Sequence, residues 1–67
     1  MNEQRILDQT DIEILKFLAE GMTLGAIGRR LDLSERTVRR RLRGICDDIG
    51  VGSPIAAVVW AVRRGVL

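Results

Sequence analysis

The stretch Leu31–Ile45, LDLSERTVRRRLRGI, determines how this chain folds. Its first residues form an abrupt turn, and Ser34 then offers a hydroxyl that can cap the free amides of a following helix. Two helices joined by so short a turn cannot easily lie antiparallel, so we expect them to cross steeply. Five arginines follow the cap within eight residues, from Arg36 to Arg43. They make the second helix of the pair strongly basic.

Helix caps and stops divide the rest of the chain in the same way. The expected caps are Asp8, Thr23, Ser34 and Ser53, and the expected stops are Gly21, the turn at 31–33, Gly50 and Gly65. Strand-like alternation does not persist along the chain. The sequence therefore predicts an all-α fold, a four-helix bundle in which the second and third helices form a helix-turn-helix.

Length and composition exclude several classes of protein. Sixty-seven residues make a single domain, expected over residues 7–67 after a short polar N-terminal lead at 1–6. The chain has no His and a lone cysteine, Cys46, so no disulfide, metal site or cofactor is expected. Cys46 is interpreted as a small buried hydrophobe. Without His or Tyr there is no nucleophile–base pair to propose, so an enzyme is not expected.

The apolar segments are too short for a membrane protein. Residues 1–5, MNEQR, are polar, and no apolar signal segment follows them. The longest apolar run, Ile55–Val62, falls far short of the roughly 20 residues that span a bilayer. We therefore expect a cytoplasmic protein without membrane contact. The start at Met1 favours a stand-alone protein, although a domain severed from a longer protein would look similar.

The helix expected at 34–49 has an apolar stripe and a basic side. On a helical wheel the stripe, assigned to the core, consists of Val38, Leu42, Ile45 and Ile49. The opposite, basic side consists of Arg36, Arg39, Arg40 and Arg43. Arg41 falls on the other flank, beside Thr37. The helix thus presents one side to the core and a nearly pure guanidinium side to its surroundings.

Two interpretations of this basic side are open: a solvated surface or a surface for a polyanion. A solvated face normally mixes both signs of charge, whereas only Asp47 and Asp48, at the helix end, offer partners here. Residues 34–67 carry seven Arg against three acids, while residues 1–33 carry four basic against six acidic residues. We therefore favour a polyanion.

The expected polyanion is duplex DNA. Single-stranded nucleic acids stack their bases on aromatic rings, and this chain has only Phe17 and Trp60. A B-DNA major groove instead admits one helix and offers guanine O6 and N7 as acceptors for Arg.

Five short motifs carry a family resemblance. They are EIL at 13–15, LAEGMT at 18–23, SERTVR at 34–39, IGVGS at 49–53 and the closing RRGVL at 63–67. On these motifs the segment Leu7–Leu67 resembles the LuxR/GerE/FixJ-type helix-turn-helix domain from end to end. The resemblance implies a bacterial transcription regulator that binds DNA as a homodimer. A two-fold dimer predicts an inverted-repeat operator, and RNA polymerase is kept as a candidate partner.

The resemblance also implies roles for individual side chains. The expected base contacts are Arg39, Arg40 and Arg43. The expected contacts with the DNA backbone are Thr23, Ser34, Arg36, Thr37 and Arg41. Arg41 stands where the family often has His, a departure that still suits a phosphate contact.

The helix expected at 53–64 carries more apolar residues than packing requires. Its segment Ile55–Val62, IAAVVWAV, is apolar around the whole circumference, although a surface helix of a small domain needs one apolar stripe. We interpret a second stripe as the dimer interface, in agreement with the use of this helix in the resembling family. The stripe consists of Ala56, Val59, Trp60 and Arg63. The alternative is that Trp60 folds back over the core.

A different class of function is also open. The chain could be a small interaction module that docks on a sigma factor or another regulator through the fourth helix and the arginine side. Competition by duplex DNA distinguishes the two functions.

Overall fold

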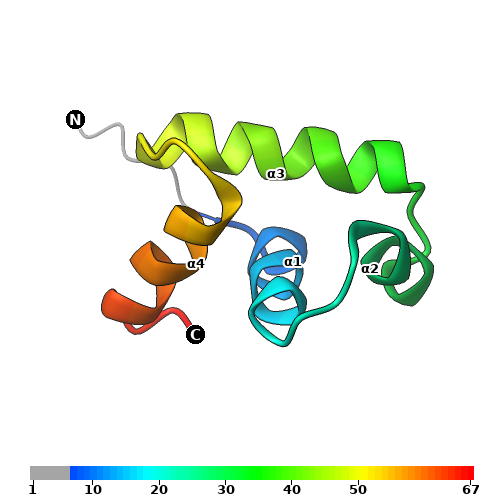
Figure 1. Ribbon diagram of the computed structural model, residues 1–67, viewed down its shortest axis with the longest axis horizontal. Coiled ribbons are helices and arrows are strands. Elements are labelled where there is room, and N and C mark those ends of the chain that lie inside the picture. The colour runs from blue at the N-terminus through cyan, green and yellow to red at the C-terminus, as the bar shows by residue number, and fades with distance from the viewer. Residues whose placement is uncertain (1–6) are drawn as a thin grey trace.

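The computed structural model describes residues 7–67, which form four helices (Figure 1). They are α1 (Gln9–Ala19), α2 (Leu24–Leu31), α3 (Glu35–Ile49) and α4 (Pro54–Arg63). The predicted all-α architecture is therefore confirmed, with the helices between the expected caps and stops. The expected polar lead at 1–6 lies outside the described residues.

Each helix begins at a polar cap whose side-chain oxygen accepts a hydrogen bond from the amide three residues later. The caps are the four that the sequence predicts: Asp8, Thr23, Ser34 and Ser53. At α1 the capping is reciprocal, because the Asp11 amide donates to Asp8 Oδ1 at 2.9 Å and the Asp8 amide donates to Asp11 Oδ2 at 3.4 Å. A cap of this kind contributes about 1 kcal/mol to stability.

The turn between α2 and α3 depends on close backbone packing. Asp32 ends α2 in the left-handed conformation, with φ of 61°, and the Leu33 amide donates to the Gly28 carbonyl at 2.7 Å. A Cβ added at Gly28 would lie 2.5 Å from the Leu33 carbonyl oxygen, so no larger residue fits there. The glycine therefore has a structural role. It allows the turn to fold tightly against α2 and fixes the direction in which α3 leaves.

Helix α3 is the longest element and contacts all three other helices. In Figure 1 it runs along one long edge of the molecule, with α4, α1 and α2 arranged beneath it. Of the predicted core stripe, Val38, Leu42 and Ile45 are fully or almost fully buried. Ile49, the last residue of the helix, is only half-buried and packs against the edge of the core. The buried apolar core is completed by Ile14, Leu15, Ile27, Ala57 and Ala61.

The link from α3 to α4 sets the end of the basic helix. Gly50 adopts the left-handed conformation, with φ of 76°, and the Val51 amide donates to the Cys46 carbonyl at 3.0 Å, the bond of a Schellman end.

No single helix of residues 7–67 is long and apolar enough to cross a membrane. The pair α3 and α4, bent by 58°, qualifies together by length and composition alone.

Candidate nucleic-acid interface

The basic side of α3 is exposed, as the helical wheel predicts. Arg36, Arg39, Arg40 and Arg43 are all solvent-exposed. On the opposite side of the helix Val38 and Ile45 are completely buried. The rotation of α3 about its axis is therefore fixed by its apolar stripe, and the four guanidinium groups necessarily point outward.

Arg39 and Arg43 line one groove on the surface of the domain. The groove runs along α3 between the start of α2 at Leu24 and the α3–α4 link, and Arg36 and Arg40 are not among its lining residues. The remainder of its lining consists of Leu42, Cys46, Asp47, Val51, Gly52, Ser53 and Pro54. Two of the three predicted base contacts thus come together, one turn apart, in the same concave surface.

The Arg39 guanidinium has a partner that the sequence prediction missed. Its Nη2 donates to Glu35 Oε2 at 2.7 Å, an ion pair between residues four apart. The interpretation that Arg39 lacks an acidic neighbour is therefore wrong. The signal was present in the sequence, because Glu and Arg at this spacing lie on the same side of a helix.

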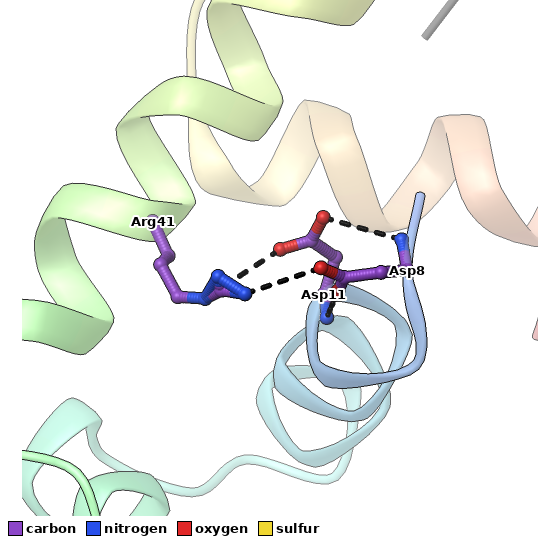
Figure 2. Close-up of polar contacts among 3 residues, drawn as sticks. All are labelled: Asp8, Asp11 and Arg41. Atoms are coloured by element: carbon purple, nitrogen blue, oxygen red, sulfur yellow. Dashed lines mark hydrogen bonds and ion pairs between the residues drawn. The ribbon is translucent and has the colours of Figure 1, made fainter. Parts of the chain in front are cut away.

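Arg41 lies apart from the other arginines, at the contact between α3 and the N-terminus of α1 (Figure 2). Its Nη2 donates to Asp8 Oδ2 at 3.2 Å, and its Nε lies 3.9 Å from Asp11 Oδ1. The side chain of Arg41 is 33% exposed and that of Asp11 is 1% exposed. Arg41 therefore joins two helices, and only part of its guanidinium is available to a phosphate.

The hydroxyls among the expected backbone contacts are already engaged in helix capping. Thr23 Oγ1 accepts from the Ala26 amide at 3.1 Å, and Ser34 Oγ accepts from the Thr37 amide at 3.0 Å. Ser34 Oγ also donates to Thr37 Oγ1 at 2.9 Å. Thr23 and Ser34 remain exposed, so each hydroxyl can approach a phosphate while it still caps its helix.

Cys46 is buried and is one of the residues that line the groove. Burial, and to a lesser degree the neighbouring Asp47 carboxylate, raises the pKa of the Cys46 thiol. The thiol therefore stays protonated at neutral pH and behaves as the small apolar side chain that the sequence predicts.

Helix α4 exposes an apolar patch made of Ile55, Val59 and Val62, which are 68%, 44% and 55% exposed. Of the predicted dimer stripe, Val59 and Arg63 are exposed, whereas Ala56 and Trp60 are half-buried. Trp60 packs against the core, and Arg64 lies over its ring at 4.9 Å from the centroid. The apolar surface thus centres on Val59 rather than on Trp60, because α4 is rotated to bury Ala57 and Ala61.

A steep helix pair whose second helix turns one side to the core and a basic side to solvent is typical of DNA-binding helix-turn-helix domains. The model of the family "bacterial regulatory proteins, luxR family" matches residues 5–61. The chain therefore belongs to the luxR family of bacterial regulatory proteins, a family of DNA-binding domains of transcription regulators and not an enzyme class.

One curated relative supports the same assignment. The "transcriptional regulatory protein YdfI" of Bacillus subtilis (strain 168) is 38% identical over 61 residues. The match covers 91% of this chain and 29% of the relative, so the chain spans less than a third of that protein's length. No solved structure gives a significant match.

Proposed function

We propose that this domain recognises a specific duplex sequence by inserting α3 into the major groove. The observation that carries the proposal is the position of Arg39 and Arg43, exposed one turn apart and lining the same groove. Four residues along a helix advance the side chain by one turn, so the two guanidinium groups can address neighbouring base pairs. Arg40, exposed next to Arg39, is the third proposed base contact.

The remaining arginines and the capping hydroxyls are proposed to hold the DNA backbone. Arg36 is exposed beside the base-reading residues, and Thr23 and Ser34 stand at the N-termini of two helices, where free amides favour phosphate. Thr37 lies one turn before Arg41 along α3, and Arg41 contacts the N-terminus of α1. Contacts of this kind fix the orientation of the protein on the duplex but carry no sequence information.

We further propose that α4 pairs two copies of the domain on DNA. The support is the exposed apolar patch of Ile55, Val59 and Val62, which would be covered in a two-fold contact. The operator should then be an inverted repeat with half-sites about 10 bp apart. The protein would act in the cytoplasm, at the nucleoid, with RNA polymerase as a further candidate partner. The same patch could instead dock a sigma factor or another regulator.

The decisive experiment selects bound sequences from a random duplex pool and then compares arginine variants on the selected site and on a scrambled one. Removing a base contact by Arg39→Ala or Arg43→Ala should lower affinity for the selected site by about 1–3 kcal/mol and relax the preference at one base position. Removing a phosphate contact by Arg41→Ala should weaken both duplexes equally and flatten the dependence of log affinity on log salt by about one unit.

Three results would contradict parts of this proposal. Equal losses on both duplexes for Arg39→Ala and Arg43→Ala would exclude base reading by these residues. If no arginine variant loses affinity for DNA, the basic side of α3 is a solvated surface and not a DNA contact. Failure of duplex DNA to compete with a bound protein partner would favour the interaction module.

A further inference from the structure

We infer that Glu35 is a specificity-determining residue of α3, which orients the Arg39 guanidinium toward a base edge while its own charge weakens binding to DNA of any sequence. The inference rests on the proposed function, in which Arg39 reads a base. Glu35 would then be an acidic member of a proposed DNA-binding surface that consists mainly of arginines.

The ion pair fixes one side of the guanidinium and leaves the other free. Arg39 Nη2 and Glu35 Oε2 are 2.7 Å apart, the short distance of a charge-assisted hydrogen bond. The two side chains are 59% and 55% exposed, and pairs at such exposed positions contribute little to stability. The guanidinium has five N–H donors, so those not engaged by Glu35 can still form a two-pronged contact with an acceptor edge.

The Glu35 carboxylate occupies space that α2 leaves open. A Cβ added at Gly25 would lie 3.3 Å from Glu35 Oε1, so this oxygen faces α2 while Oε2 faces Arg39. Glu35 also stands in the first turn of α3, where the helix dipole favours a negative charge. The N-terminal part of a recognition helix is the part that contacts base edges. The carboxylate is thus placed where it can direct Arg39.

Arg43 lies in the same groove, and among the described residues no carboxylate is paired with it as Glu35 is with Arg39. Asp47 follows it by four residues and also lines the groove, yet within residues 7–67 no ion pair joins Arg43 to Asp47. Asp47 therefore provides a matched control, an exposed carboxylate on the same helix that does not orient the arginine one turn before it.

The two effects of Glu35 have opposite signs, which makes them separable. A carboxylate close to the DNA phosphates opposes every duplex, so its removal should raise general affinity. Fixing a flexible side chain before binding removes part of the ordering cost of the correct complex, so loss of the pair should lower discrimination. A purely structural role would lower affinity for all duplexes together.

The experiment measures Glu35→Gln against the selected duplex and a scrambled duplex at several salt concentrations. Affinity for the scrambled duplex should rise, and the selected-to-scrambled affinity ratio should fall by about 2- to 10-fold, the equivalent of ordering one long side chain. The base position that becomes relaxed should be the one that Arg39→Ala relaxes. Glu35→Asp keeps the charge on a shorter side chain and should lower the ratio without raising affinity for the scrambled duplex.

The controls separate this inference from the proposed function. Asp47→Asn should raise affinity for both duplexes equally and leave the selected-to-scrambled affinity ratio unchanged. Glu35→Gln should likewise leave this ratio unchanged when Arg39 is already Ala. The inference is overturned if Glu35→Gln alone leaves the selected-to-scrambled affinity ratio unchanged. It is also overturned if Glu35→Gln lowers that ratio equally when Arg39 is already Ala. Equal binding of both duplexes by the unaltered domain would instead defeat the proposed function. Far-UV circular dichroism checks that each variant keeps its helices.

Discussion

Replacing Arg41 by Ala removes the guanidinium that joins α3 to the N-terminus of α1 (Figure 2). The guanidinium lies 3.2 Å from Asp8 Oδ2 and 3.9 Å from Asp11 Oδ1. Because the Asp11 side chain is only 1% exposed, water cannot readily replace the lost cation at that carboxylate. The variant should therefore lose stability as well as charge.

Two known limits bracket the magnitude of this loss. Removing one partner of a fully buried ion pair destabilises a protein by about 3–5 kcal/mol, and an exposed pair contributes about 0–1 kcal/mol. Arg41 is 33% exposed and Asp8 is 59% exposed, so this contact lies between the two. We expect a loss of about 1–3 kcal/mol. In a domain of this size each 1 kcal/mol corresponds to a fall of about 4–8 °C in Tm, measured by thermal unfolding.

Two controls isolate the contact from the loss of charge. Arg40→Ala removes the same charge from an exposed neighbouring position and should change stability by no more than about 0.5 kcal/mol. Combining Arg41→Ala with Asp11→Asn should cost less than the sum of the single losses, because the two substitutions remove the two partners of one contact. Equal Tm values for Arg41→Ala and Arg40→Ala would refute the reasoning and leave the whole guanidinium available to DNA.

Three further predictions follow from burial and exposure. Leu42→Ala should lower stability by about 2–5 kcal/mol, much of the total for so small a domain, and an unchanged Tm would contradict its place in the core. Val59→Glu should abolish paired binding to the full operator and leave the helices intact, whereas unfolding would show that Val59 is a core residue. Because burial raises the pKa of the Cys46 thiol, the stability it contributes should be complete below about pH 8.5 and lost as pH rises toward the raised pKa. The check is to measure the unfolding free energy of the unaltered domain and of Cys46→Ala across alkaline pH. It should decline more steeply for the unaltered domain.

The helix boundaries could be predicted because they depend on local chemistry. A cap such as Ser34 bonds to an amide three residues away, and a stop such as Gly50 depends on its own backbone conformation. The apolar stripe of α3 is equally local, since the helical period alone decides which residues share a side. The same rule predicts Arg39 and Arg43 on the exposed side of α3, where the structure has them.

The contacts between helices could not be predicted in this way. Arg41 meets Asp8 across 33 residues of chain, so their pairing depends on how α3 crosses α1. The half-burial of Trp60 depends on a rotation of α4 that two alanines allow, and an almost wholly apolar segment carries no pattern to fix that rotation. The Glu35–Arg39 pair is different, because it follows a local spacing rule and does not depend on how the helices pack.

Helix α3 packs against the core with one side and presents arginines to solvent with the other. Changes at positions 36, 39, 40 and 43 therefore leave the inward packing untouched, apart from the local pair between Arg39 and Glu35. Under the proposed function, exchanging these few residues would change the operator that is bound without destabilising the fold. The same separation makes the domain a practical scaffold, on which a library at positions 35, 36, 39, 40 and 43 would vary the DNA sequence that is bound and spare the fold.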